Sequence, residues 1–184
     1  MSLEQPSLPT LGKPALEVGP VFLCFEIQGR PGFKGRHRSR LVIPKDAWTG
    51  FGPNAFIMKG DIKKLWIQHY ADTETAQYES TIAEYAGWLM RAERKQPSER
   101  PLALLVHAYI AVPKSWSKRD QAEALFGGIL PVSRPDGDNY LKVASDALNG
   151  VAWKDDSQVV DTRCIKCYSS DPALRIEVRE FITP

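Results

Sequence analysis

The sequence predicts a single domain of the α/β (α+β) class, in which helices flank a mixed β-sheet. Three observations lead to this expectation. The chain has 184 residues, which is close to the usual size of one domain. Runs of alternating or continuous apolar residues, typical of strands, are interspersed with runs that have helical spacing. These runs do not follow the regular strand–helix–strand repeat of an all-parallel sheet, which favours a mixed one.

The N-terminal part combines an arm with short strands. Residues 1–20 contain four prolines and few large apolar side chains, so we expect a flexible arm before a domain that spans residues 21–184. From Val21 to Ile27, large apolar residues recur at every second position, which predicts a strand. One or two shorter strands are expected around residues 41–43 and 65–67.

A long helix and a buried strand are expected next. Asp72 or Thr73 can cap a helix whose apolar residues continue at helical spacing as far as Leu89. Residues 102–112 form the most apolar stretch of the chain. We expect them to form a central strand that is buried on both faces.

The last third of the sequence predicts two more helices and two strands. A polar helix is expected over residues 117–125. Another helix should open at Asp138 and stop at Asn149-Gly150, a typical C-terminal signal. Residues 158–168 and 174–181 have the pattern of two strands, which we expect to pair with each other.

The composition indicates the cellular compartment in which the protein is expected to work. No apolar run approaches the roughly 20 residues needed to span a bilayer, and no signal-peptide pattern opens the chain. Three cysteines, an odd number, argue against a disulfide framework and for a reducing compartment. We therefore expect a cytoplasmic protein with no membrane partner. The net charge of +2 is too small to indicate a nucleic-acid partner by itself.

Three aspartates are candidate ligands for a metal ion. Asp136 and Asp138 are two residues apart, and on extended backbone such side chains point the same way. Asp156 can meet them if the intervening helix and turn fold back. Three ionised carboxylates in one place need a cation, or one of them must stay protonated. Oxygen ligands without histidine or cysteine favour Mg²⁺, with Mn²⁺ as a substitute, and we expect no small-molecule cofactor.

A lysine accompanies these acids. Lys142 lies four residues after Asp138 and therefore on the same face of the expected helix. A cation beside a metal held by carboxylates suits phosphoryl chemistry, because both can stabilise charge on phosphate oxygens. The alternative is structural: Asp138 caps a helix, Asp155-Asp156 forms a solvated turn and Lys142 balances the acids. The residues alone leave both interpretations open.

A basic segment complements the acidic one. From Gln28 to Lys45 there are six cations and no acid, with glycines that let the backbone approach a ligand. The expected contacts to the phosphates of a polyanion come from Arg30, Lys34, Arg36, Arg38 and Arg40. A solvated loop that contacts no ligand is the alternative.

One segment carries a resemblance to a known family. Residues 134–160 read RPDGDNYLKVASDALNGVAWKDDSQVV. They contain in order a D-x-D-N-x-x-K block, D-A-L-N-G, a turn with an aromatic residue, and D-D-x-Q-V. This order resembles the signature of the RusA-type Holliday-junction resolvases, the endodeoxyribonuclease RusA family. Weaker similarities lie at Gly29–Arg38, as in G-x-P-x-x-K-G-R-x-R, and at Thr75–Glu79, as in T-x-x-Y-E, so the resemblance spans roughly residues 21–178.

The resemblance implies a magnesium-dependent endodeoxyribonuclease whose mixed sheet is flanked by helices. It implies that Asp136, Asp138 and Asp156 are magnesium-binding catalytic carboxylates. It also implies that Lys142 is a catalytic lysine and Asp155 an accessory acid. Members of the family are homodimers that resolve four-way DNA junctions by paired nicks. A nuclease for other branched DNA, such as flaps or forks, and a non-catalytic DNA-binding module are the alternatives.

The chain departs from the family pattern in two respects. The residue between the first two aspartates is usually aliphatic in the family, whereas here it is Gly137. The chain is also longer than minimal members of the family, with extra sequence at its N-terminus and around residues 48–61 and 114–132. The added segments bear on the choice of junction more than on the chemistry.

Overall fold

The computed structural model describes residues 17–34, 38–42, 48–49, 56–57, 66–70 and 73–182, with the side chains of residues 17–34 and 73–182. Its main sheet has four strands in the order β1-β8-β6-β7. The strands are β1 (Glu17–Gln28), β6 (Leu102–Ala111), β7 (Val159–Ser169) and β8 (Ala173–Ile182). Strands β1 and β6 are each antiparallel to β8, whereas β6 and β7 are parallel. The expected mixed sheet is therefore confirmed.

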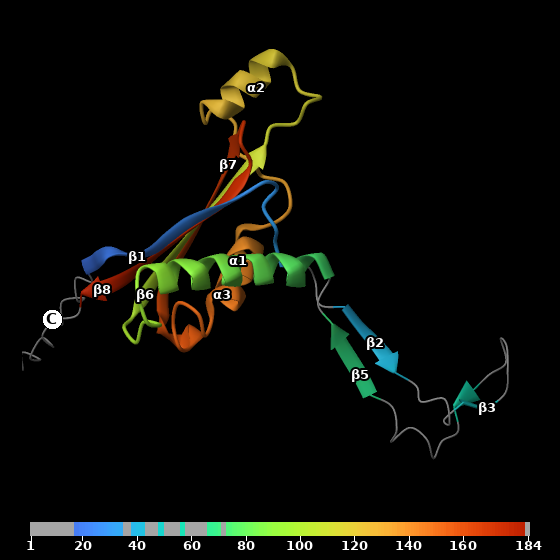
Figure 1. Cartoon of the computed structure of the whole chain (residues 1–184). Helices are drawn as coiled ribbons and strands as arrows, with labels where there is room; N and C mark the ends of the chain where they lie inside the picture. Colours follow the sequence, from blue (N-terminus) through green and yellow to red (C-terminus); the bar gives the residue numbers. More distant parts are fainter. Residues whose placement is uncertain are drawn as a thin grey trace, which may run out of the picture.

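Helices α1 (Thr73–Ala92) and α3 (Gly137–Leu148) cover one face of this sheet. The chain also forms α2 (Lys118–Leu125) and a short 3₁₀-helix η4 (Asp156–Gln158). Helices α1 and α3 pack against each other and the sheet, whereas α2 projects beyond the ends of β6 and β7 (Figure 1). This is the single α+β domain that the sequence predicts. In the described ranges, no helix combines the length and the apolar character that a membrane crossing requires.

Four short strands lie outside the main sheet. They are β2 (Arg38–Val42), β3 (Trp48–Thr49), β4 (Phe56–Ile57) and β5 (Trp66–Tyr70). Strand β2 pairs antiparallel with β5, and β3 pairs antiparallel with β4. Strands β2 and β5 confirm the two short strands expected around residues 41–43 and 65–67.

Two features of the sheet differ from the sequence-based expectation. Strand β1 begins at Glu17, so residues 17–20 belong to a strand rather than to the expected arm, and residues 1–16 lie outside the described residues. The predicted pairing of β7 with β8 is wrong, because β6 lies between them. The buried residues Leu102, Leu104 and Val106 explain this order, since a central position removes the most apolar strand from water most completely.

Helix α3 is fixed to the core by its apolar face. Tyr140, Val143 and Leu148 on this face are almost completely buried. They join one hydrophobic core with Ile82 of α1 and with Trp153, which follows the helix. Burial of each large apolar side chain stabilises the fold by about 1.5–3 kcal/mol. The opposite, polar face of α3 is therefore held in a defined orientation toward solvent.

The loop at residues 29–34 is attached to both α1 and α3. The Lys34 amide donates to the Asn139 carbonyl at 3.0 Å, and the Thr75 hydroxyl donates to the Phe33 carbonyl at 3.3 Å. Gly32 lies directly against the ring of Tyr78, where an added Cβ would overlap the ring atoms. The T-x-x-Y-E segment thus serves to hold this loop, a function that its sequence did not indicate.

Gly32→Ala is expected to lower the free energy of unfolding by about 1–3 kcal/mol, because its Cβ must displace the half-buried Tyr78 ring. Gly87→Ala in α1 is a suitable control, since the nearest atom there is the mobile end of Arg91 at 3.3 Å. That change should stabilise the helix by up to about 1 kcal/mol. Denaturant unfolding of both variants measures the difference. Equal stabilities would contradict the close contact between Gly32 and Tyr78.

Candidate active site

The N-terminal end of α3 carries the first two predicted acids. Asp136 is the N-cap residue, with extended backbone, and Asp138 lies in the first helical turn. Both residues are exposed, and the Asp136 side chain does not cap the helix. The expected extended backbone therefore ends at Asp136, and the helix begins before Asp138 rather than at it. The helix terminus carries roughly half a positive charge, which stabilises two acids even without a cation.

A lysine on the neighbouring strand fixes the backbone before Asp136. The Lys166 ammonium, on β7, donates to the carbonyl oxygens of Ser133 at 2.7 Å and Pro135 at 2.8 Å. The peptide bond between Arg134 and Pro135 is cis. These two charge-assisted hydrogen bonds, to the carbonyls on either side of Arg134, restrict the position of this loop. This role of Lys166 was not predictable from the sequence, because no local pattern connects a strand lysine with a loop about 30 residues earlier.

Asp156 lies in η4, with its carboxylate beside Ser145 of α3. Its Oδ1 accepts hydrogen bonds from the indole of Trp153 at 2.9 Å and from the Ser145 hydroxyl at 3.2 Å. Trp153 is completely buried, so the carboxylate has a fixed anchor. Ser145 follows Asp138 by seven residues, which corresponds to two helical turns, about 10 Å along the axis. One side of α3 therefore carries Asp138 and Lys142, and the Asp156 carboxylate lies beside the next turn, at Ser145.

The structure does not bring the three predicted carboxylates into one cluster. No group of three histidine, cysteine or acidic side chains suited to a metal ion occurs within the part of the chain that the structure describes. The expectation that Asp156 meets Asp136 and Asp138 is therefore not met by this geometry. The assignment of the three residues as metal ligands stays a prediction.

Asp155 has a structural role at the start of η4. It accepts a hydrogen bond from the Ser157 amide at 2.8 Å, and the Gln158 side chain accepts one from the Asp155 amide. Hydrogen bonds from Ser157 hold the pKa of Asp155 below its ordinary value. The Gln158 amide nitrogen also donates to the Ser98 carbonyl at 2.9 Å. The D-D-x-Q block thus contains a helix cap and a tether, and the accessory catalytic role of Asp155 stays a prediction.

A cavity opens beside Asp136. Its volume is about 410 Å³, and its lining includes Arg30, Phe33, Arg134 and Asn139 in addition to Asp136. The cavity lies between the loop at residues 29–34 and the loop that precedes α3. Two arginines from segments about 100 residues apart in sequence thus meet next to a candidate catalytic acid.

The part of the chain that carries the candidate acids matches a known family. The family model described as endodeoxyribonuclease RusA matches residues 58–179, about two thirds of the chain. The chain belongs to the RusA endodeoxyribonuclease family. The protein YqaN of Bacillus subtilis (strain 168), described as uncharacterized, is 43% identical to this RusA-family chain over 82 residues. Those residues are 44% of this chain and 58% of YqaN, so the chain spans less than two thirds of that relative.

The basic residues of this RusA family member have different environments. Arg30 is exposed at the cavity, whereas the Lys34 side chain is 13% exposed. Burial lowers the pKa of Lys34. Hydrogen bonds from its ammonium to Asp146 and Glu79, together with the negative charges of these two carboxylates, raise the pKa by more, so it lies above its ordinary value. The distances are 2.5 Å to Asp146 and 2.6 Å to Glu79. Lys34 therefore links the loop to both helices, a role that differs from the predicted phosphate contact.

The other predicted phosphate contacts fall largely outside the described residues. Arg36 is outside them, and Arg38 and Arg40 lie on β2, whose side chains are not described. Their contacts with DNA stay predictions. Arg134, which the sequence analysis did not single out, lines the cavity instead.

Gly137, the family departure, contacts β7. A Cβ at this position would lie 3.4 Å from Cβ and 3.5 Å from Sγ of Cys164, which is ordinary van der Waals contact. Burial raises the pKa of the Cys164 thiol, the nearby Lys166 lowers it, and the charge of Asp138 raises it further. By these distances, an added Cβ at residue 137 would fit beside Cys164 in ordinary contact.

Proposed function

We propose that this chain is a magnesium-dependent endodeoxyribonuclease that resolves four-way DNA junctions in the cytoplasm. The family match over residues 58–179 is the observation that carries the proposal, because it includes every acid of the candidate site. Exposed acids at the end of α3 beside a cavity with two arginines support it. The three cysteines are free, in keeping with a reducing compartment.

Asp136 and Asp138 fit the requirements of a magnesium ion. Mg²⁺ is commonly held by one or two carboxylates together with water and substrate phosphates, and both side chains are exposed. When bound, the ion supplies an activated water and stabilises charge on the phosphate. Lys142, one turn further, would donate hydrogen bonds to phosphate oxygens. Asp156 would act from the same face, held by Trp153 and Ser145.

Cleavage of a panel of labelled DNAs tests this proposal. With Mg²⁺ or Mn²⁺, four-way junctions should be cut and linear duplex should not. Ca²⁺, which is larger and less demanding in geometry, should support binding but little turnover. Preference for flaps or forks would favour the broader nuclease for branched DNA. Binding without cutting in either ion would favour a non-catalytic DNA-binding module, and cutting that survives chelation would exclude the proposed metal dependence.

Paired nicking would require two copies of the site. We propose a homodimer with a two-fold axis, which places one site on each of two opposing strands. Mixing wild-type protein with an excess of Asp138→Asn should convert the linear product of a cruciform plasmid into singly nicked circles. Light scattering should give twice the chain mass of 20.6 kDa. A monomer in solution, with linear product undiminished in the mixture, would contradict the dimer.

A further inference from the structure

The cavity beside Asp136 continues into a second hollow. The second hollow has a volume of about 280 Å³ and shares Arg30, Phe33, Arg134 and Pro135 with the first. Its remaining walls come from apolar or aromatic residues, including Ile110, Tyr140 and Pro172. We refer to the two together as the α3 hollow. Small-ligand sites commonly occupy roughly 300–1,000 Å³, so the α3 hollow has room for one ligand of that class.

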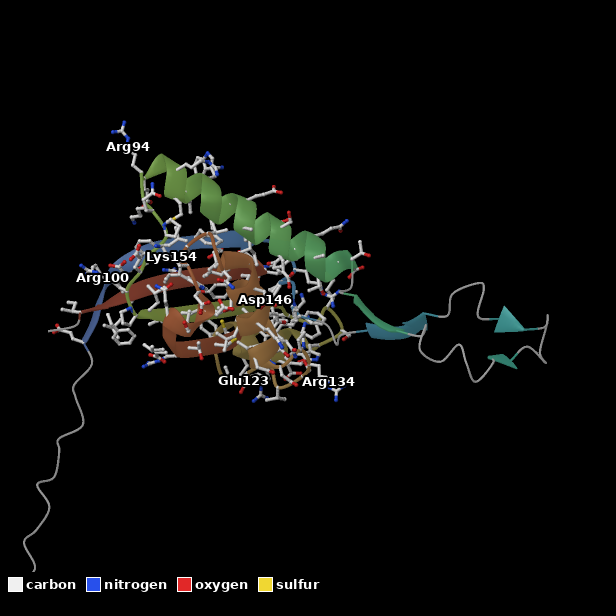
Figure 2. The ribbon with its side chains drawn as sticks, turned by 90° about the horizontal axis from the view of Figure 1, so that it is seen from below. Arg94, Arg100, Glu123, Arg134, Asp146 and Lys154 are labelled. Carbon is white, nitrogen blue, oxygen red and sulfur yellow. The ribbon has the colours of Figure 1, made fainter. Side chains whose placement is uncertain are left out.

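The rim of the α3 hollow is basic. Arg30 and Arg134 are both exposed, and neither forms an ion pair with another residue of the described ranges. Arg134 lies toward the other end of the domain from Arg100 and Lys154 (Figure 2). The Lys34 ammonium, by contrast, is occupied by two carboxylates. Two guanidinium groups at the entrance suit a phosphate, which arginine can bind through two parallel hydrogen bonds.

The inner walls are aromatic and apolar, with one amide. Phe33 and Tyr140 are in edge-to-face contact, with ring centroids 6.3 Å apart. Phe33 is half-buried, so part of its ring faces the hollow. The Asn139 amide, also in the lining, provides both a donor and an acceptor for a polar edge. An aromatic surface, an amide and two cations are the groups that recognise a base and its phosphate.

We propose that the α3 hollow receives one unpaired nucleotide of branched DNA, next to the phosphate that is cut. This inference rests on the proposed nuclease function and names the feature of the substrate that the site binds. Its phosphate would contact Arg30 and Arg134, its base would stack on Phe33, and Asn139 would bind the base edge. A stacked base pair cannot enter a hollow of this size, whereas an extruded nucleotide can.

The walls of the α3 hollow are preorganised on both sides. Lys34 fixes the loop that carries Arg30 and Phe33 to α1 and α3. Lys166 fixes the loop that carries Arg134 through the carbonyls on either side of it. A preformed pocket selects DNA in which the nucleotide is already unpaired, because extruding a base from an intact duplex costs a few kcal/mol. Selection of branched over linear DNA thus follows from the pocket.

An abasic scan of a four-way junction tests the proposal. Single abasic sites are placed at each nucleotide around the branch, and binding is measured by fluorescence polarisation in EDTA. At one or two positions next to the cleavage site, loss of the base should weaken wild-type binding by about 5- to 150-fold, the range for base–aromatic stacking. Phe33→Leu should bind the intact junction correspondingly less well and should no longer distinguish it from the abasic one.

Two further variants separate the phosphate contact from the base contact. Arg134→Gln should retain the sensitivity to the abasic site but reduce the slope of log affinity against log salt by about 0.7–0.9. Arg100→Gln, whose side chain is 68% exposed, is the matched control and should change neither property. Arg134→Gln also keeps the test decisive if Phe33→Leu fails to fold, which circular dichroism would detect.

The outcomes distinguish this inference from the proposed function. If wild-type protein cuts the junction in Mg²⁺ but no abasic position alters its affinity, the nucleotide pocket is wrong and the nuclease proposal stands. The same holds if folded Phe33→Leu keeps the full sensitivity to the abasic site. If wild-type protein neither cuts nor binds any branched DNA, both proposals are wrong.

Discussion

Asp138→Asn is expected to reduce junction cleavage by about a thousandfold or more, while the fold and DNA binding persist. The estimate corresponds to the loss of ~4 kcal/mol of transition-state stabilisation, as for a residue that holds a catalytic metal ion. Asparagine has nearly the same shape as aspartate, and Asp138 is exposed in the first turn of α3, so the change should leave the packing of the helix intact. Single-turnover cleavage rates, with thermal melts of the same preparations, measure both effects.

Asp120→Asn is the matched control for Asp138→Asn. Asp120 is the exposed acid in the first turn of α2, so its replacement removes the same kind of helix-terminus charge outside the lining of the α3 hollow. Each change should cost about 0.3–1 kcal/mol of stability through the helix dipole. Only Asp138→Asn should slow cleavage. Near wild-type nicking by Asp138→Asn in Mg²⁺ would rule out Asp138 as a metal-binding catalytic residue.

Lys34→Met is expected to give the largest loss of stability among single charge removals at this site. The change leaves Glu79 and Asp146 near each other without their cation, in a place where the Lys34 side chain is 13% exposed. Removing one partner of a fully buried ion pair costs about 3–5 kcal/mol. Because the acids are 21% and 35% exposed, we expect about 2 kcal/mol. Denaturant midpoints measure the loss.

Lys154→Met provides the comparison for Lys34→Met. Lys154 is 2.5 Å from Glu99, but the two side chains are 64% and 72% exposed, so its loss should cost less than about 1 kcal/mol. The contribution of Lys34 to the free energy of unfolding should also decrease at high pH. Its folded-state pKa is raised, so the contribution is complete below the ordinary value of 10.5 and is lost as pH rises through the folded-state pKa. Equal losses for the two lysines at pH 7 would contradict the structural role of Lys34.

Local sequence patterns predicted most of the elements, because each of those elements depends on its own periodicity. Helix α2 illustrates this: the predicted range begins at Ser117, whose hydroxyl accepts from the Asp120 amide, and ends at Leu125. The position of β6 at the centre of the sheet was predicted as well, since an apolar run of this length needs neighbours on both sides. The wrong pairing of β7 with β8 has a simple cause. A short connection favours a hairpin locally, but burial of β6 decides the order.

The sequence predicted candidate residues for the site but not their arrangement in space. Asp138 and Lys142 lie on one face of α3, as a spacing of four residues indicates. The position of Asp156 depends on the indole of Trp153 and the hydroxyl of Ser145, and no spacing rule relates these groups. The roles of Lys166 and Lys34 likewise rest on contacts between segments that are distant in sequence. Such contacts follow from the completed fold and leave no periodic pattern.

The central position of β8 has a consequence for the synthesis of this protein. Strands β1 and β6 do not touch each other across the sheet; each is hydrogen-bonded to β8, which occupies residues 173–182. A nascent chain that has released everything before β8 therefore has an N-terminal strand without a partner and a central strand lacking one neighbour. The sheet can close only after residues 173–182 have left the ribosome. Loss of β8 by truncation would therefore separate β1 from the β6–β7 pair, which is the part of the sheet on which α3 packs.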